Sequence, residues 1–325
     1  MPVSLSGLAA IEWLASESTR DDPAASSHWR EFHRDFQYSG EGFEGLMGFG
    51  GNDPPHRGLR GVFIGLLQRR FRGLGRDFPH FAEFDQCARD ITRAQSRAHD
   101  IDVMRQSLTL ALLASHTQAL GPEKTACVIG DGFGSMTALL LATNSAARVI
   151  LVNLSRTLLV DLWYLRLWMT SEVFDKSVSL ARTAEEIEEY CTLTGPSGSG
   201  TRVVAVRAQD HRLLRVAPLD VALNMVSFQE MDPPRIGEYF DDLRAVADRR
   251  SLVLYCCNRE EKRLPDGTVT RFSEYPWSLL DEVIVDELCP WHQEYYSVRP
   301  PFYRPYDGLI RHRMVVMSPN SLKYD

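Results

Sequence analysis

The sequence has no long apolar run and no excess of positive charge. A run of about 18 apolar residues, the minimum for a helix that crosses a bilayer, does not occur, and the first residues lack the basic-then-apolar order of a secretory signal. The 36 Lys and Arg residues are outnumbered by 43 Asp and Glu residues, for a formal net charge of −7. Because proteins that bind nucleic acid usually carry a basic surface, we expect neither a membrane nor a nucleic acid as partner.

Cysteine is scarce and scattered. The six cysteines contain no CxxC pair, and from their spacing we expect no zinc cluster. Cys127 and Cys256 fall in apolar stretches, where cysteine acts as a small hydrophobe. A chain of unpaired cysteines is typical of a reducing compartment, so a cytoplasmic location is expected. A hydrophobic content of 44% and a charged content of 24% are those of a globular protein.

Three closely spaced glycines dominate the stretch ACVIGDGFGSMT, residues 126–137. A β-branched run leads into Gly130, Gly132 and Gly134, and an apolar, helix-favouring run follows. Glycines allow a sharp turn and the close approach of a ligand, and the helix N-terminus adds unpaired N–H donors. The dinucleotide fingerprint GxGxxG would need a glycine where Ser135 stands. Asp131 would repel a pyrophosphate but pair with an ammonium group, which favours S-adenosylmethionine (SAM) as the ligand of this loop.

Strands and helices alternate from about residue 125 onward. Apolar runs predict strands at 127–129, 148–152, 202–207, 219–224 and 252–256, with helices at 135–143, 157–169, 184–190 and 235–247. Two late strands, 283–287 and 312–317, are joined by an irregular segment and are expected to pair antiparallel. The pattern predicts an α/β protein with a Rossmann-like doubly wound sheet, mostly parallel with a C-terminal antiparallel strand.

The first hundred residues predict a mostly helical cap or lid region, with residues 101–325 as the cofactor-binding and catalytic domain. Helices are expected at 7–16, 28–36, 81–99 and 101–120, and the aromatic stripe of 28–36 favours packing on the main domain. The glycine-rich segment 40–55 suits either a lid or a loose connection. The segment 194–200 is predicted to be a surface loop.

Ligands of doubly wound sheets lie beyond the carboxyl ends of the strands, so polar residues that follow strands are candidates for cofactor binding. Asn153 follows the second strand, where an acid that binds ribose hydroxyls is more usual. Gln209 and Asp210 follow the third strand and are expected near an adenine, although Asp210 also suits a simple turn. Asn224 ends the fourth strand.

A second group of polar and aromatic residues follows the later strands. Candidates for the proton acceptor are Glu230, after the fourth strand, and His292, in the aromatic segment CPWHQEYY. The expected substrate contacts are Ser227, Gln229, Asn258, Trp291, Tyr295 and Tyr296. Four acids lie near strand ends and could gather around a divalent metal: Glu230, Asp232, Asp286 and Glu287. No local spacing demands such an ion, so a metal is not excluded but we assign none.

Seven segments together resemble the sugar O-methyltransferase family of the class I SAM-dependent methyltransferases. They are IGDGFGSM, LVNLSRTLLVDLWYL, LNMVSFQEM, IGEYF, YCCNREEKRLPDGTV, FSEYPW and CPWHQEYY. The resemblance spans about residues 100–318, and its most specific segments are SFQEM and CPWHQEYY. It implies SAM as cofactor, with S-adenosylhomocysteine as its product. It also implies transfer of a methyl group to a hydroxyl of a sugar or glycoside, as in bacterial polysaccharide or natural-product pathways.

Three alternatives stay open at this point. In the first, the chain is a methyltransferase whose acceptor is a non-sugar hydroxyl or amine. In the second, it is a non-catalytic scaffold of the same fold, an alternative supported by the unusual Asn153. A nicotinamide dehydrogenase is the third and weakest. The expected partner is a small sugar or glycoside, and a homo-oligomer is left open.

Overall fold

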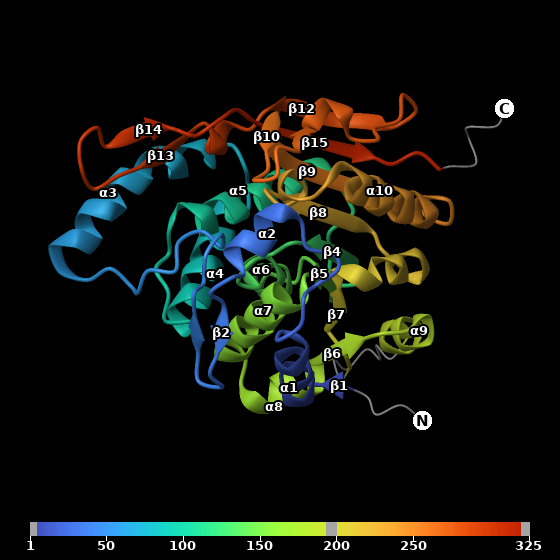
Figure 1. Cartoon of the computed structure of the whole chain (residues 1–325). Coiled ribbons are helices and arrows are strands. Elements are labelled where there is room, and N and C mark those ends of the chain that lie inside the picture. The colour runs from blue at the N-terminus through green and yellow to red at the C-terminus, as the bar shows by residue number, and fades with distance from the viewer. Residues whose placement is uncertain (1–4, 193–199, 320–325) are drawn as a thin grey trace.

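The computed structural model, in which residues 5–192 and 200–319 are described, is built on one nine-stranded sheet (Figure 1). Its strand order is β1-β6-β7-β5-β4-β8-β9-β15-β12. The parallel strands are β4 (Thr125–Ile129), β5 (Arg148–Asn153), β6 (Val178–Ala181), β7 (Val203–Arg207), β8 (Val221–Met225) and β9 (Val253–Arg259). The antiparallel strands are β1 (Leu5–Ser6), β12 (Glu282–Leu288) and β15 (Ile310–Val316). The predicted fold class, a Rossmann-like doubly wound sheet with antiparallel C-terminal strands, is confirmed.

The order of the strands reverses at β4, which has β5 on one side and β8 on the other. The chain first places β5, β6 and β7 on one side of β4, with β7 between β5 and β6, and then crosses to the other side of β4 to place β8 and β9. Such a reversal leaves a crevice at the carboxyl ends of the central strands, since the loops there diverge to opposite sides. The candidate site is therefore expected where β4, β5 and β8 end.

Helices cover both faces of the sheet, which explains why its central strands are continuously apolar. One face packs on α1 (Leu8–Glu17), α4 (Phe81–Ala94), α5 (Ile101–His116), α6 (Ser135–Ala142), α7 (Ser155–Trp168) and α8 (Ser171–Ser177). The other face packs on α9 (Ala184–Thr192), α10 (Pro233–Ala247) and the 3-10 segment η1 (Ala208–Val216). Successive residues of β4 alternate between the two cores: Val128 faces the first and Ile129 the second.

The remaining elements, all short except helix α3, complete the described parts of the chain. They are α2 (Ser27–Phe32), β2 (Gln37–Tyr38), β3 (Phe43–Glu44), α3 (Gly58–Leu74), η2 (Phe228–Glu230), β10 (Glu261–Arg263), β11 (Val269–Arg271), η3 (Phe272–Glu274), η4 (Pro290–His292), β13 (Glu294–Tyr296) and β14 (Tyr303–Pro305). The sequence did not predict β1, β6, α3 or α8, and it extended the helices of 28–36, 81–99 and 101–120 too far. Residues 193–199 of the predicted loop 194–200 lie outside the described residues.

The first hundred residues do more than cap the sheet. Strand β1 pairs with β6 and so extends the sheet itself, and Phe81 and Ile91 of α4 are buried in the core beside α5 and α6. The boundary near residue 100 stays a prediction. What the structure adds is that this part of the chain contributes both a strand and core side chains.

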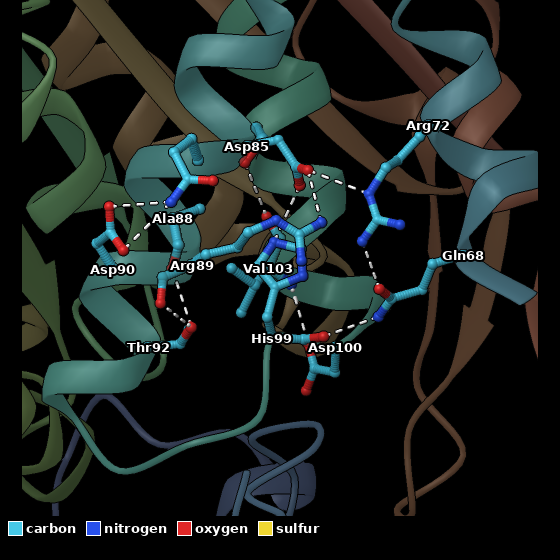
Figure 2. Close-up of polar contacts among 12 residues, drawn as sticks. Gln68, Arg72, Asp85, Ala88, Arg89, Asp90, Thr92, His99, Asp100 and Val103 are labelled. Atoms are coloured by element: carbon cyan, nitrogen blue, oxygen red, sulfur yellow. Dashed lines mark hydrogen bonds and ion pairs between the residues drawn. The ribbon is translucent and has the colours of Figure 1, made fainter. Parts of the chain in front are cut away.

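A buried polar network holds α3 in place, although its glycines and arginines hid it from sequence analysis (Figure 2). The Asp85 carboxylate accepts hydrogen bonds from Arg72 Nε at 3.1 Å and from an Arg89 nitrogen at 2.8 Å. Gln68 Nε2 donates to the carbonyl of His99 at 2.8 Å, while His99 Nε2 lies 3.0 Å from Asp85. Burial alone would raise the pKa of Asp85, but its hydrogen bonds from His99 and Arg89 lower it well below the ordinary value.

A second buried ion pair anchors α10 to the segment before β12. Arg244 donates to both oxygens of Asp281, at 2.9 and 3.0 Å, and both side chains are only 2% exposed. Burial alone would raise the pKa of Asp281, but hydrogen bonds from Arg244 and from two backbone N–H groups lower it to about 2. Because the folded pKa lies below the unfolded value of about 4, this carboxylate stabilises the fold above pH 4, and the contribution is lost as the pH falls toward 2.

We predict that Asp281→Asn lowers the free energy of unfolding at pH 7 by about 3–5 kcal/mol, because it leaves Arg244 buried without its counter-charge. Urea unfolding at several pH values should also show a weaker loss of stability between pH 4 and 2 than in the unmodified chain. Asp286→Asn is the control, since Asp286 pairs with Arg311 and Arg313 at 27% exposure. Equal losses for the two variants would contradict the assignment.

Candidate active site

A cavity of about 240 Å³ lies at the carboxyl ends of β4, β5, β8 and β9. Among the residues that line it are Gly132, Asn153, Ser227, Glu230, Arg259 and His292. We call it the main cavity. Its walls come from four successive strand ends of the sheet, which is where doubly wound folds bind their ligands.

The three glycines of the loop after β4 serve two different purposes. All have positive φ, at +78° for Gly130, +95° for Gly132 and +61° for Gly134. A Cβ atom on Gly130 would lie 2.1 Å from Ser227 Oγ, and one on Gly134 would lie 2.8 Å from the Leu165 side chain. A Cβ on Gly132 would meet no protein atom within 4 Å. Gly130 and Gly134 are thus required for packing, whereas Gly132 leaves space open toward the main cavity.

Asp131 lies at the cavity wall, but its carboxylate is also tied to the protein. It accepts hydrogen bonds from the backbone N–H groups of Met136 at 2.9 Å and Thr137 at 2.8 Å, so it caps α6. Burial raises the pKa of Asp131, and these hydrogen bonds partly offset that rise. The capping contacts explain why an acid stands inside the turn, and its predicted pairing with a ligand ammonium stays a prediction.

Asp161 of α7 is a site residue that sequence analysis missed. Its carboxylate accepts from the backbone N–H of Gly134 at 3.0 Å and from Asn153 Nδ2 at 2.9 Å, and the side chain is fully buried. Burial, followed by the nearby Asp131, raises the pKa of Asp161 well above its ordinary value. The available signal was a single carboxylate among the mostly apolar residues of the predicted helix 157–169.

We predict that Asp161→Ala lowers the free energy of unfolding by about 1–3 kcal/mol, because two buried donors lose their acceptor. Chemical denaturation of Asp161→Ala, Asn153→Ala and the double variant measures this. The two substitutions should be non-additive, since both remove the same hydrogen bond. Strictly additive losses would show that the two side chains do not interact.

Gln209 and Asp210, which were expected near an adenine, lie outside the main cavity. The side-chain oxygen of Gln209 accepts from the Arg207 guanidinium at 2.8 Å, and Asp210 accepts from Arg207 Nε at 2.7 Å. A smaller pocket of about 20 Å³ adjoins the main cavity, and its lining includes Ala208, the residue before Gln209. We call it the side pocket. It shares Trp29, Asn153, Ser227 and Glu230 with the main cavity.

Three buried amides hold the loop after β8. Asn224 Nδ2 donates to the carbonyl of Ile129, and Asn224 Oδ1 accepts from the N–H of Phe228, both at 3.0 Å. Asn258 Nδ2 donates to Asn224 Oδ1 at 2.8 Å, and Asn258 Oδ1 accepts from the Gln229 N–H at 3.1 Å. Of these amides, only Gln229 is among the residues lining the main cavity. The other two position the loop that carries Ser227 and Glu230.

Glu230 stands where the main cavity and the side pocket meet, and the N-terminal region reaches it. His28 Nε2 lies 3.5 Å from Glu230 Oε1, and Ser26 Oγ donates to the Glu230 carbonyl. Trp29 lines both spaces, and Phe49 of the glycine-rich segment packs on Trp29 with ring centroids 5.5 Å apart. The aromatic stripe expected to serve packing therefore also forms a wall of the site.

The aromatic segment after β12 does not gather at one place. His292 lines the main cavity, whereas Trp291 is buried behind it, edge-to-face with His312 at 5.3 Å. Tyr296 lines a separate cavity of about 330 Å³ beside Asp100, and Tyr295 lines none of these three spaces. Burial lowers the pKa of His292 well below its ordinary value, and the neighbouring Arg105 and His312 lower it further.

Three buried polar atoms of the cavity lining have no hydrogen-bond partner among the described residues. They are Gln106 Oε1, an acceptor, Arg259 Nε, a donor, and His292 Nδ1. Buried polar groups are normally paired, by protein or by a bound molecule. Nothing in the local pattern of the sequence marks Gln106, whereas Arg259 follows the fifth predicted strand beside Asn258, where substrate hydrogen bonds were expected.

Comparison with known proteins gives structural neighbours but no family. No family model matches the chain, and no curated protein does. The methyltransferase domain of a bacterial Hen1 protein has 14% identity and a TM-score of 0.36, over 67% of this chain and 100% of that one. A SAM-dependent methyltransferase of Leishmania major has 10% identity and a TM-score of 0.30, over 77% of this chain and 90% of that one. A protein that converts a disulfide bond into a thioacetal group in echinomycin biosynthesis has 13% identity and a TM-score of 0.36, over 66% and 83%.

These neighbours are similar to this chain in fold alone. Within residues 5–192 and 200–319, no helix is long and apolar enough to cross a membrane.

Proposed function

We propose that the protein is a SAM-dependent methyltransferase that transfers a methyl group to a hydroxyl of a sugar or glycoside. The observation that carries the proposal is the space above Gly132, at the carboxyl ends of β4, β5 and β8. A glycine turn between a buried strand and a helix N-terminus, with an acid in place of phosphate-binding glycines, suits a ligand that carries an amino group.

The chain's own residues divide into a cofactor side and an acceptor side. The backbone of the glycine loop, Asp131 and Asn153 would hold SAM, which supplies an activated methyl group when bound. Gln106 Oε1 and Arg259 Nε offer an acceptor and a donor without protein partners, so they suit the hydroxyls of a polyol. Trp29 and Phe49 line the cavity from the N-terminal side, where they would shield the reacting groups from water.

Glu230 is our candidate for the proton acceptor. Its side chain is only 13% exposed, it lines the cavity and the side pocket, and His28 stands 3.5 Å from its Oε1. Its carboxylate would take the hydroxyl proton as the oxygen attacks the methyl group, and the imidazole of His28 would orient that carboxylate. His292, the other sequence candidate, is disfavoured as a base because its surroundings lower its pKa.

We predict that Gly132→Val abolishes SAM binding in isothermal titration, because the branched side chain would occupy the space above the loop. Gly267→Val is a matched control: Gly267 has φ +91°, also meets no atom within 4 Å, and lies in the exposed turn between β10 and β11. Both variants carry similar backbone strain, but only the first blocks the site. Unchanged SAM affinity in Gly132→Val would refute the cofactor site. If the unmodified chain bound NAD instead of SAM, the dehydrogenase alternative would be favoured.

We predict that Glu230→Gln lowers kcat for a glycoside acceptor by about 10²–10⁴-fold while SAM affinity stays the same, since only the proton acceptor is removed. Turnover on a panel of glycosides, aromatic alcohols and amines identifies the acceptor class. A loss of less than about tenfold would exclude Glu230 as the proton acceptor. SAM binding without turnover on any acceptor would support the scaffold alternative.

A further inference from the structure

The structure brings Cys257, near the end of β9, together with two residues of the later segment CPWH, Cys289 just after β12 and His292 in η4. One ligand atom from each, two sulfurs and a ring nitrogen, lies within 4.8 Å of both others. All three residues are buried, at 0%, 0% and 4% exposure. We infer that they form a binding site for a thiophilic divalent cation, with zinc as the expected ion.

The chemistry of the donors favours this ion. Two thiolates and one imidazole are the ligands that Zn²⁺ prefers over oxygen-only sets. Two thiolate charges would also balance the charge of a divalent ion, so the buried site would carry no net charge that needs solvation. Cys289 and His292 stand in a Cys-x-x-His turn, closed by a hydrogen bond of 3.1 Å from the His292 N–H to the Cys289 carbonyl.

A second observation points to a missing ligand at the same place. His292 Nδ1 is buried and has no hydrogen-bond partner among the described residues. An unpaired buried nitrogen of this kind costs stability, and a metal ion supplies the partner that the protein does not. Coordination through Nδ1 would give this nitrogen its partner and fix the tautomer, with the proton on Nε2.

The turn that carries two of the donors is held rigidly, as a metal site requires. Arg105 of α5 donates from Nε to the carbonyl of Trp291 at 2.9 Å and from a terminal nitrogen to the carbonyl of Glu294 at 2.8 Å. These two carbonyls flank His292, and the Arg105 guanidinium is itself paired with Asp102 at 2.8 Å.

Three protein ligands leave one position of a tetrahedral ion open, as in catalytic zinc sites. Because His292 also lines the main cavity, we place that open position on the cavity side. This last step rests on the proposed function: the ion would bind the oxygen of the acceptor, and Glu230 would take its proton. The metal site itself is independent of it.

Cobalt titration tests the site directly. The full-length chain is reduced without thiols, freed of metal with a chelator, and titrated with Co²⁺ in the absence of SAM. We expect one Co²⁺ per chain, a near-ultraviolet charge-transfer band from thiolate to cobalt, visible bands of four-coordinate intensity, and displacement by Zn²⁺. Absence of the charge-transfer band would overturn the inference. So would a chain that is isolated with a Cys257–Cys289 disulfide and still binds no Co²⁺ once that disulfide has been reduced.

Variants separate this site from adventitious thiol binding. Cys257→Ser, Cys289→Ser and His292→Asn should each weaken Co²⁺ binding by more than about 100-fold, since the loss of a ligand exceeds the loss of a supporting contact. Cys256→Ser is the matched control, because Cys256 is adjacent on β9 and equally buried but belongs to the core of the opposite face. Equal weakening by Cys256→Ser, or an unchanged spectrum in His292→Asn, would contradict the site.

Circular dichroism checks that each variant folds. If a serine variant fails to fold, metal binding by the unmodified chain still tests the proposed site. Isothermal titration of SAM into the metal-free chain keeps the two proposals apart. SAM binding without Co²⁺ binding would refute the metal site alone, and the reverse result would refute the methyl-transfer proposal alone.

Discussion

The whole site depends on the close approach of two loops, the glycine loop after β4 and the loop after β8. The backbone of Gly130 passes so near Ser227 that any Cβ would collide with its hydroxyl. This approach is possible because β4 and β8 are parallel neighbours whose carboxyl ends meet at the point where the strand order reverses. The cavity, the direction of α6 and the position of Glu230 all follow from it.

Buried polar residues hold the two loops in that position. Asp161 accepts a hydrogen bond from the Gly134 N–H of the glycine loop, and the hydrogen-bonded pair Asn224–Asn258 holds the loop after β8. Their hydrogen bonds are made inside the protein, where a lost partner is costly. Several polar side chains of the kind that often bind ligands therefore hold the two loops in position instead. The groups available to a ligand are those with unpaired atoms, such as Gln106 and Arg259.

The N-terminal region completes the site from outside the sheet. Segments around His28, Trp29 and Phe49 lie against loops that follow β4 and β8, while β1 extends the sheet at its far edge. Arg105 performs a similar task on the other side, where it binds two carbonyls around His292. Walls of the cavity thus come from segments that are distant in the sequence, and each is fixed by a few specific contacts.

The sequence by itself determined the α/β class, the five central parallel strands, the antiparallel pair at the C-terminus and the glycine turn. These features arise from local periodicity and from the backbone freedom of glycine, both of which act over a few residues. It did not reveal β6 or α3, whose patterns are short or interrupted by glycines and whose stability comes from partners such as Asp85.

Only the tertiary structure decided which polar residues meet. Gln209 and Asp210 follow a strand as expected but turn to Arg207. Cys257, Cys289 and His292, by contrast, come together although cysteine spacing gave no reason to expect a metal site. The physical reason is that a hydrogen-bond partner or a ligand set is chosen by distance in space, and distances between strand ends are set by the order of the strands, which no local pattern encodes.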